Sequence, residues 1–510
     1  MPLEAIELPP PRIEPPAALA DLFRSDPYER VSHGLGKAYR DVVRGFRGQV
    51  DHPPDLVAHP GDEREVEQVL AWCSEEGLAA IPFGGGTSVV GGVEPRMGDA
   101  CPGAVTIDLG RLDRVLDLDL ASGAARIQAG ALGPGLEDQL GEHELTLRHF
   151  PQSFEFSTLG GWIATRAGGH FATLYTHIDD LVESVRAITP RGAWESRRLP
   201  GSGAGPSPDR MLLGSEGILG VITEAWVRVR KRPRWKLSAG VGFESFAAGA
   251  EAVRELSQSG LHPSNCRLLD AAEASLTHAG PPGMALLVLG FESAHHPVDG
   301  AIEIALEAVR EHGGKPGEVT VRSAPEPRRA AGRENPPVQG AAGSDPVGSW
   351  RHAFLAAPYL RDTLVALGVL SDTFETAITW ERFAEFHGRV TETARRAIAD
   401  ACGTPPNGPG SPRLSCRFTH VYPDGPAPYY TVLCPARRGG EVEQWDEIKA
   451  AVSEAVIDAG GTITHHHAVG RDHRPWYDRQ RPDRFAEALR AAKRAIDPNG
   501  VLNPGVLIDP

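Results

Sequence analysis

A glycine-rich segment near the start of the chain carries the clearest chemistry. Residues Gly84–Ser88 read Gly-Gly-Gly-Thr-Ser and follow a short apolar run, Ala79–Pro82. Glycine has no Cβ, so successive backbone N–H groups can converge on an anion that approaches the chain closely. The segment therefore predicts a phosphate cradle at the end of a strand.

This loop differs from the two commonest nucleotide-binding loops. It lacks the Gly-Lys-Ser/Thr ending of nucleoside-triphosphatase loops, and Val89 stands where the dinucleotide fingerprint needs its third glycine. The sequence of the loop therefore argues against both ATP and NAD as its ligand. Taken alone, the loop is as consistent with a structural glycine turn as with a phosphate site, and both interpretations stay open at this point.

Regular elements surround the loop and must position it. The hydrophobic periodicity predicts a helix and several short strands in this region. We interpret them as short β–α–β alternations. The helix is expected over Glu63–Glu76, and the strands over Ala79–Pro82, Ala104–Leu109, Ala124–Ala129 and Val221–Val229. The basic, proline-containing run at 230–234 predicts a domain boundary.

A second block of the chain begins near Lys236 and has strand and helix signals of its own. Its insert at 324–347 is rich in Pro, Gly, Ala and Arg, which predicts a mobile loop. Further on, helices are expected over Trp380–Asp400 and Pro482–Ala495, and paired strands over Leu414–Val421 and Tyr429–Leu433. The proline-rich residues 1–20 are expected to wrap the surface or stay mobile.

Composition limits the class of protein. A chain of 510 residues with 41% hydrophobic content can close a core and suggests two or three domains. A formal charge of -15 argues against a nucleic-acid partner. The apolar runs are shorter than the roughly 20 residues that span a bilayer, and neither end resembles a leader or organelle signal, so a soluble, cytoplasmic protein is expected. The six scattered cysteines predict thiols rather than disulfides.

Several ordered motifs together resemble the FAD-binding domain of the vanillyl-alcohol oxidase / p-cresol methylhydroxylase (PCMH) superfamily. They are the glycine loop, Val105–Leu112, Arg126–Ala131, Pro151–Trp162 and Gly214–Ile222. The resemblance implies an α+β fold: a PCMH-type, two-subdomain FAD-binding domain, an α/β cap domain, and a C-terminal helical segment that returns to the FAD domain. The chain would then divide into an N-terminal extension (1–50), the FAD domain (51–232), the cap (233–450) and the C-terminal segment (451–510).

The same resemblance assigns residues to the FAD. The expected cofactor-binding residues are Phe83, Gly84, Gly85, Gly86, Thr87, Ser88, Val89, Gln152, Ser153, Phe154, Glu155, Phe156, Ser157, Thr158, Thr165, Arg166, Ala167, Gly168, Glu216, Gly217, Ile218, Leu219, Gly220, Val221 and Ile222. Some members of the superfamily tether FAD through a His or Cys beside the glycine loop. Residues 85–91 contain neither, so non-covalent FAD is expected, with a distal His left open as a tether.

Within the superfamily the chain most resembles the alkyldihydroxyacetonephosphate synthases, which exchange an acyl for an alkyl chain in ether-lipid synthesis without net redox change. The resemblance extends from about Arg30 to Leu507. Cys266–Asp270 is one of the supporting stretches. Four others lie outside the FAD domain, where superfamily members diverge most, and these are Tyr359–Asp362, Thr373–Thr376, Ser415–Arg417 and Thr464–Gly470.

The synthase resemblance implies roles for eight residues outside the cofactor motifs. Substrate would be bound by Arg361 and Thr373, activity would be supported by His149 and Arg267, and the catalytic residues would be Tyr429, His465, His466 and His467. A guanidinium suits a phosphate because its fork donates two parallel hydrogen bonds. A phenol can relay a proton if its anion is stabilised.

Two points about these assignments stay open. Tyr430 adjoins Tyr429, so a shift of one residue is an alternative. On a strand, His465 and His467 would face one side and His466 the other, so the run does not by itself make a zinc pair, and no metal is expected.

The reaction also has alternatives. Thr373 stands where the synthases carry Ser, and the ending Asp497–Gly505 looks more like the FAD-linked 2-hydroxy-acid dehydrogenases. A redox enzyme that oxidises a 2-hydroxy acid or a related alcohol is therefore the second hypothesis, and a flavin-binding protein without catalysis is the third. The expected partner is a small-molecule or lipid-like substrate, with no nucleic acid and no transmembrane segment. A homodimer and a peripheral membrane contact stay open.

Overall fold

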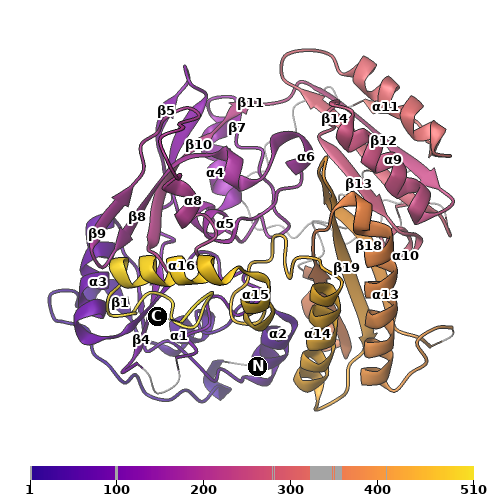
Figure 1. Ribbon diagram of the computed structural model, residues 1–510. Coiled ribbons are helices and arrows are strands. Elements are labelled where there is room, and N and C mark those ends of the chain that lie inside the picture. Colours follow the sequence, from indigo (N-terminus) through magenta and orange to yellow (C-terminus); the bar gives the residue numbers. More distant parts are fainter. Residues whose placement is uncertain are drawn as a thin grey trace.

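The chain folds into two lobes that lie side by side (Figure 1). The structure, a computed structural model, describes residues 3–97, 101–277, 279–280, 282–321, 347, 350, 359–408 and 410–509. The first lobe contains residues up to 232 together with the C-terminal segment from 469, and the second lobe contains residues 233–459, with the loop 460–468 between them. The insert expected at 324–347 lies, apart from Val347, outside the described residues.

A small sheet in the first lobe ends at the glycine loop. Its strand order is β1-β2-β4-β3, with β2, β4 and β3 parallel and β1 antiparallel to β2. Parallel strands share one carboxyl edge, so the loop after β3 lies at that edge. The elements of this region are η1 (Leu3–Ala5), η2 (Ala20–Leu22), β1 (Phe23–Arg24), α1 (Pro27–Ser32), α2 (Tyr39–Arg47), β2 (Leu56–Ala58), α3 (Glu63–Glu76), β3 (Ala79–Phe83) and β4 (Ala104–Asp108).

Helix α3 has the predicted bounds because both of its ends are capped. The Asp62 side chain accepts a hydrogen bond from the N–H of Glu65 at the first turn. At the other end Gly77 adopts a left-handed conformation with φ of +67°, which glycine reaches without steric cost. Val66, Val69, Leu70 and Cys73 form the buried face of the helix.

A second, antiparallel sheet of the first lobe has the strand order β5-β6-β10-β8-β9. The strands expected after the glycine loop therefore fall in two sheets instead of continuing one β–α–β series. The elements here are β5 (Val115–Asp119), β6 (Ala124–Gln128), α4 (Gly133–Gly141), β7 (Leu145–Thr146), α5 (Leu159–Thr165), α6 (Ala172–Tyr175), α7 (Ile178–Leu181), β8 (Val182–Thr189), β9 (Gly192–Glu195), α8 (Asp209–Leu212), β10 (Val221–Arg228) and β11 (Arg230–Lys231).

The C-terminal segment returns to the first lobe, as the resemblance implied. It consists of α15 (Arg474–Gln480), α16 (Asp483–Ile496) and the residues that follow them. The buried Lys493 Nζ donates to the carbonyl oxygens of Ile218 (2.9 Å) and Leu502 (2.7 Å) and pairs with Asp497. Leu502 also forms a parallel bridge with Ala80 of β3 and lies in the hydrophobic core of this lobe.

One antiparallel sheet forms the second lobe, in the order β15-β12-β14-β13-β18-β19-β17, with β16 paired to β12. The helix predicted over Trp380–Asp400 and the strand pair around residues 423–426 are confirmed as α13, β18 and β19. The elements are β12 (Trp235–Phe243), α9 (Phe246–Gln258), β13 (Asn265–Leu269), α10 (Ala271–Leu276), β14 (Ala285–Ser293), α11 (Asp299–Glu311), β15 (Lys315–Pro316), β16 (Thr320–Val321), β17 (Val369–Glu375), α13 (Trp380–Cys402), β18 (Arg413–Val421), β19 (Pro426–Pro435) and α14 (Glu441–Asp458).

The N-terminal residues connect the two lobes. The proline-rich segment follows the first lobe, where Arg12 pairs with the buried Asp55. Residues Ala38, Tyr39 and Val43, at the start of α2 and within it, belong instead to the hydrophobic core of the second lobe. The two lobes therefore share a helix in addition to the chain crossings between them.

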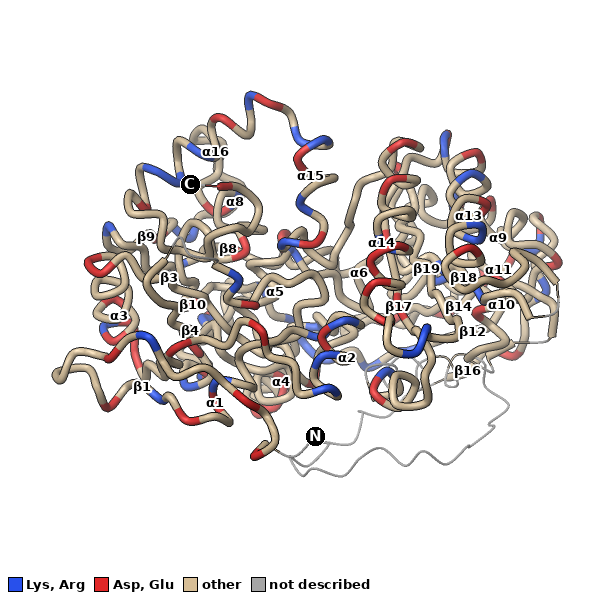
Figure 2. Tube along the Cα trace, turned by 90° about the horizontal axis from the view of Figure 1, so that it is seen from below, with Lys and Arg blue, Asp and Glu red and all other residues tan. Residues whose placement is uncertain are grey.

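Charge distribution, helix hydrophobicity and the cysteines complete the description of the fold. Acidic and basic positions are interspersed along α13, whereas the charged positions of α3 and α14 are mostly acidic (Figure 2). Among the described helices, none combines the length and the apolar character that a membrane crossing requires. All six cysteines are free thiols.

Candidate active site

The glycine loop after β3 packs against residues 152–158, so two of the expected FAD-binding segments meet. A Cβ on Gly85 would lie 1.6 Å from the carbonyl oxygen of Phe156, and one on Gly84 would lie 2.3 Å from Thr158 Oγ1. The first of these contacts is with backbone, so a side chain at that position would force the two segments apart. Glycine is required here by close approach.

The backbone N–H groups of this loop are available to a ligand. Within the part of the chain that the structure describes, no protein atom accepts a hydrogen bond from the N–H groups of Gly85, Gly86, Thr87 or Ser88. These residues are buried or half-buried, where unpaired donors are costly. Several such donors on one glycine-rich turn suit an anion, so the loop fits the pyrophosphate of FAD.

Of the other expected FAD-binding segments, residues 216–222 approach the glycine loop and residues 165–168 approach the second lobe. Arg166, which ends α5 at φ of +53°, donates through Nε to Asp179 at 2.7 Å. A Cβ on Gly217 would lie 2.9 Å from Pro82 Cγ, beside the glycine loop. Gly168 approaches the second lobe, since its Cβ would lie 2.6 Å from His420 Nε2 on β18. The segment expected to line the flavin therefore touches the second lobe at a histidine.

Glu216 joins the first lobe to the loop that carries the histidine run. Its carboxylate accepts the N–H groups of Val469 (2.9 Å) and Gly470 (2.8 Å), and its backbone carbonyl accepts Asn503 Nδ2 at 2.7 Å. Burial raises the pKa of Glu216 to about 7, although the two backbone donors oppose the shift. This side chain therefore orders residues 469–470, a contact that the sequence did not indicate.

Tyr429 and Thr373 lie on neighbouring strands of the second lobe. The Tyr429 hydroxyl donates to Thr373 Oγ1 at 3.0 Å, and the side chain is only 4% exposed. The guanidinium of Arg417 on β18 lies 4.0 Å from the centre of the Tyr429 ring and pairs with Glu273. The alternative Tyr430 faces the other side of β19, where its hydroxyl lies 3.0 Å from His387 Nδ1 on α13.

The histidine run lies in a loop between α14 and α15 and not on a strand, so the alternation considered from the sequence does not apply. The ring of His466 stacks near that of Tyr429 at 6.0 Å, and the ring of His467 meets it edge-on at 5.4 Å. His465 Nε2 lies 2.9 Å from the Tyr422 hydroxyl. Burial lowers the pKa of His465 to about 3, with a further contribution from His466.

A buried carboxylate, Glu375 at the end of β17, holds this loop. It accepts hydrogen bonds from the backbone N–H groups of His465 (2.7 Å), His466 (3.2 Å) and His467 (3.0 Å) and from the Thr464 hydroxyl (2.5 Å). Burial acts to raise the pKa of Glu375, but the adjacent histidines outweigh it and hold that pKa well below its usual value. The sequence assigned no role to Glu375.

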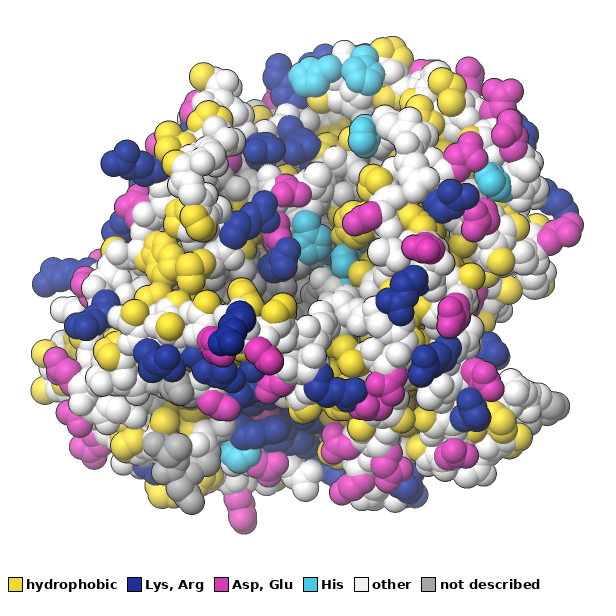
Figure 3. Space-filling model, viewed as in Figure 1, with side chains coloured by type: hydrophobic (Ala, Val, Ile, Leu, Met, Phe, Trp, Pro, Cys, Tyr) yellow, Lys and Arg dark blue, Asp and Glu magenta, His cyan; other side chains and the backbone are white. Residues whose placement is uncertain are grey.

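Further histidines extend the cluster towards the first lobe. His420 on β18 lies 5.3 Å from both His465 and His466, ring centre to ring centre, and His177 lies 5.5 Å from His465. Ligand-capable atoms of His420, His465 and His466 lie within 4.8 Å of one another, which is close enough for a cation, although the sequence predicted no metal. Figure 3 shows histidine side chains in a hollow between the lobes, with basic side chains beside it.

The two residues expected to support activity are deeply buried. His149 lies 5.1 Å from Trp162 between ring centres, and burial, with His177, lowers its pKa to about 3. Arg267 on β13 donates through Nη2 to the carbonyl oxygen of His170 at 3.1 Å. Burial and the neighbouring Arg417 lower the pKa of Arg267 to about 9. Of these two neighbouring guanidinium groups, that of Arg417 lies against Tyr429, and that of Arg267 is held at the His170 carbonyl.

Arg361 lies near the glycine loop. Its Nη1 donates to the carbonyl oxygen of Lys37 at 2.6 Å, and the Lys37 N–H donates to the carbonyl oxygen of Ser88 at 2.6 Å. Two residues earlier, the Tyr359 ring meets Phe156 edge-on at 5.5 Å. The helical segment 359–366 therefore contacts Lys37 and Phe156, which both adjoin the glycine loop. This places the segment beside the expected FAD site.

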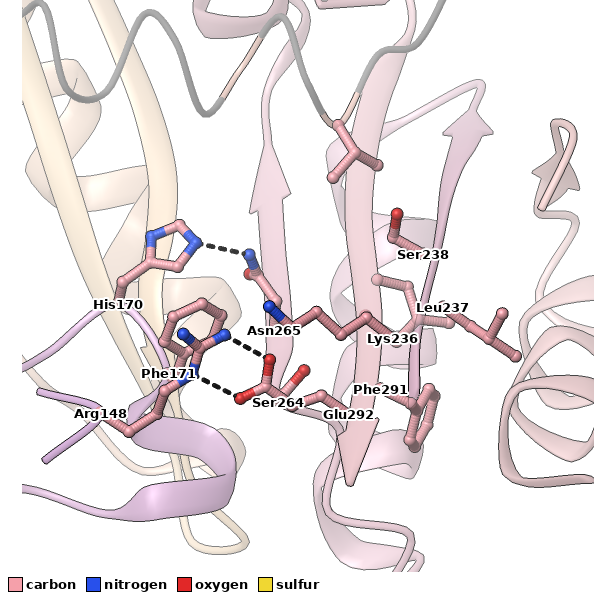
Figure 4. Close-up of a pocket in the computed structure, with 13 residues that line it drawn as sticks. Arg148, His170, Phe171, Lys236, Leu237, Ser238, Ser264, Asn265, Phe291 and Glu292 are labelled. Atoms are coloured by element: carbon pink, nitrogen blue, oxygen red, sulfur yellow. Dashed lines mark hydrogen bonds and ion pairs between the residues drawn. The ribbon is translucent and has the colours of Figure 1, made fainter. Parts of the chain in front are cut away.

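A separate cavity of about 130 Å³ lies between the lobes (Figure 4). Arg148 forms a buried ion pair with Glu292 in its wall, and Asn265 Nδ2 lies 2.9 Å from His170 Nε2. The histidine run and Tyr429 are not among its lining residues. The cavity is therefore distinct from the histidine cluster.

Comparisons with known proteins match both halves of the chain. A family described as "FAD binding domain" matches residues 54–196, and one described as "FAD linked oxidases, C-terminal domain" matches residues 232–507. Curated proteins called alkyldihydroxyacetonephosphate synthase are similar over nearly the whole chain. The one from Trypanosoma brucei brucei is 30% identical over 99% of this chain and 82% of its own length, and the one from Dictyostelium discoideum is 32% identical over 96% and 79%.

Solved structures and more distant proteins extend the comparison. A structure of alkyldihydroxyacetonephosphate synthase superposes with a TM-score of 0.78 at 27% identity and covers 99% of this chain and 87% of its own. A p-cresol methylhydroxylase structure, 17% identical, shares the fold with a TM-score of 0.71 over 97% and 95% of the two chains. The glycolate oxidase subunit GlcD of Bacillus subtilis is 24% identical over 90% of this chain and 89% of its length.

Proposed function

Because this chain belongs to the FAD-linked oxidase family and, within it, to the alkyldihydroxyacetonephosphate synthases, we propose that it exchanges the acyl chain of an acyl-dihydroxyacetone phosphate for the alkoxy group of a fatty alcohol. The products are the ether-linked phosphate and a free fatty acid, so the reaction involves no net oxidation. The chain is an FAD-binding enzyme of this family.

One observation carries the proposal. Residues that the synthase resemblance marks outside the FAD domain converge on one place: Tyr429 hydrogen-bonds to Thr373 and stacks near His466. His420 then connects this group to Gly168 of the expected flavin lining. A substrate held between them would have the flavin on one side and proton-transfer groups on the other.

The residues of this chain have separable roles in the proposal. His466, beside Tyr429, takes the phenolic proton, and the Tyr429 phenolate then takes the proton at C1 of the substrate and later returns it. Arg361, at the glycine-loop side, binds the phosphate through its guanidinium fork. FAD, when bound, supplies a ring that can hold an electron pair during the exchange.

The second candidate, oxidation of a 2-hydroxy acid, is favoured by the similarity to a glycolate oxidase subunit. The C-terminal motif at 497–505 does not add to it. Asp497 is buried, pairs with Lys493 and accepts the N–H groups of Val501 (3.1 Å) and Leu502 (2.8 Å). This motif closes the core of the first lobe, and a motif used for packing does not discriminate between the two reactions.

The proposal is tested with purified, flavin-loaded enzyme. Acyl-dihydroxyacetone phosphate and labelled hexadecanol are expected to give labelled ether phosphate without oxygen uptake or dye reduction. Lactate and glycolate with a redox dye provide the second arm. Dye reduction by either acid, combined with no label in the phosphate product, would overturn the synthase proposal in favour of the oxidoreductase.

We also propose that FAD is held without a covalent bond, because residues 85–91 contain no His or Cys. Acid precipitation of the yellow protein is then expected to leave the flavin in the supernatant. Flavin that stays with the precipitate would contradict this part of the proposal and direct attention to the histidines of the cluster as tethers.

A further inference from the structure

The loop 464–467 has no regular secondary structure, yet it must hold His466 beside Tyr429. A loop normally gains its order from many weak contacts. Here three successive backbone N–H groups and one hydroxyl converge on a single carboxylate, that of Glu375, which is 3% exposed. Charge-assisted hydrogen bonds of this kind are roughly twice as strong as neutral ones.

Glu375 is also connected to Tyr429. The two residues are direct partners across β17 and β19, so they occupy the same register of the sheet. Their neighbour on β17, Thr373, accepts the Tyr429 hydroxyl, and the ring of His467 meets the ring of Tyr429. The end of β17 therefore contacts both the histidine loop and Tyr429, and fixes the position of one relative to the other.

We propose that Glu375 is a positioning residue of the active site: its carboxylate gathers the backbone of residues 464–467 and so fixes His466 and His467 against Tyr429. The proposal rests on the proposed function only in assigning proton transfer to these side chains. The gathering of the loop itself follows from the hydrogen bonds of the carboxylate.

The isosteric substitution Glu375→Gln separates these effects. The amide oxygen can replace Oε1, which accepts from Thr464, His466 and His467. The amide NH2 then faces the N–H of His465 where Oε2 accepted at 2.7 Å, so two donors oppose each other. One side of the loop loses its partner, and the rings move. A displacement of about 1 Å in a catalytic group can cost about 100-fold in rate.

Glu137 provides a matched control. This buried residue of α4 accepts one threonine hydroxyl, from Thr146 (2.9 Å), and two successive backbone N–H groups, from Leu147 (3.0 Å) and Arg148 (3.2 Å). All three donors meet Oε1, so Glu137→Gln removes a buried carboxylate charge away from the histidine loop without setting the new NH2 group against a backbone donor. A general cost of losing a buried carboxylate would appear in both variants.

The experiment measures amide hydrogen exchange, flavin content and turnover in wild type, Glu375→Gln, Glu375→Asp and Glu137→Gln. Wild type is first assayed for both alcohol exchange and dye reduction, and whichever turnover it has is used for the variants. Failure of the proposed function is thereby seen separately, in the wild type alone.

In Glu375→Gln, we expect faster amide exchange in peptides covering 464–467, unchanged flavin content, a KM within about threefold, and a kcat lowered by about 10- to 100-fold. Glu375→Asp keeps the charge and should recover part of kcat. In Glu137→Gln, the amide oxygen can replace Oε1, which accepts all three hydrogen bonds, so exchange at 146–148 and at 464–467 should stay close to that of the wild type. Unchanged exchange at 464–467 in Glu375→Gln, or faster exchange there with wild-type kcat, would overturn the proposal.

Discussion

Removing one oxygen atom from Tyr429 tests the chemistry most directly. In Tyr429→Phe the ring stays buried, with the Arg417 guanidinium 4.0 Å from its centre and the ring of His466 6.0 Å away. The substitution removes the 3.0 Å hydrogen bond from the Tyr429 hydroxyl to Thr373. The variant is therefore expected to fold and to bind FAD as the wild type does.

Two magnitudes separate a structural from a catalytic role for this hydroxyl. Loss of one neutral hydrogen bond costs about 1 kcal/mol of stability, which corresponds to a small fall in Tm. Loss of a general acid–base group lowers the rate by about 10²- to 10⁴-fold, or about 3 to 5 kcal/mol in the activation barrier. The catalytic effect therefore exceeds the structural one by a wide margin.

Tyr430→Phe is the natural control, because it removes the same atom from the next residue. That hydroxyl lies 3.0 Å from His387 Nδ1, on the opposite side of β19 from the histidine loop. Initial rates of labelled-alcohol incorporation, at equal flavin content, should fall at least 100-fold in Tyr429→Phe and stay within about threefold of wild type in Tyr430→Phe. The reverse pattern, or a Tyr429→Phe rate within fivefold of wild type, would refute the assignment of proton transfer to Tyr429.

Three further predictions follow from the geometry. Gly85→Ala should lose most of its flavin, because the added Cβ would lie 1.6 Å from the Phe156 carbonyl oxygen, whereas Gly45→Ala, with no atom near its added Cβ, should keep it; equal flavin absorbance in the two purified proteins would contradict this. Arg361→Lys should raise the KM of the phosphorylated substrate at least tenfold with unchanged flavin content, because a point charge replaces a bidentate fork, and unchanged kinetics would assign Arg361 to packing. Burial lowers the pKa of His473 to about 4, below the value of about 6.5 in an unfolded chain, so the unfolded state binds the proton first and stability is lost as pH falls. The unfolding free energy of wild type relative to His473→Gln, from urea titrations, should therefore drop by about 1.4 kcal/mol per pH unit between pH 6.5 and 4, and a pH-independent difference would disprove it.

Local patterns in the sequence predicted the elements well. The helix over Glu63–Glu76 agrees at both ends because an Asp N-cap and a C-terminal glycine mark it within the chain itself. The strands predicted at 104–109, 124–129 and 221–229 agree to within a residue, because local hydrophobic patterns also mark them. Their division between two sheets could not be predicted, since it depends on pairing between strands that are far apart in sequence.

The candidate site shows the same limit. Arg417 and His420 lie on β18 and Glu375 lies at the end of β17, and they meet Tyr429 or the histidine run only in the folded chain. In the sequence Glu375 is one polar residue in a strand, and nothing near it indicates that its partners follow about ninety residues later. The sequence identified the histidine run as a set of catalytic residues. Its loop conformation, however, depends on that same distant carboxylate.

The return of the C-terminal segment to the first lobe has a consequence for how the protein is made. Leu502 bridges Ala80, and Val506, Leu507 and Ile508 lie in the core that contains β3 and β10. A ribosome must therefore synthesise the entire second lobe before the lobe that began first can close. At about 5 to 20 residues per second, the nascent first lobe waits tens of seconds with part of its apolar surface uncovered. Chaperone dependence during expression, and loss of soluble protein when residues after 496 are deleted, are the expected signs of this order of assembly.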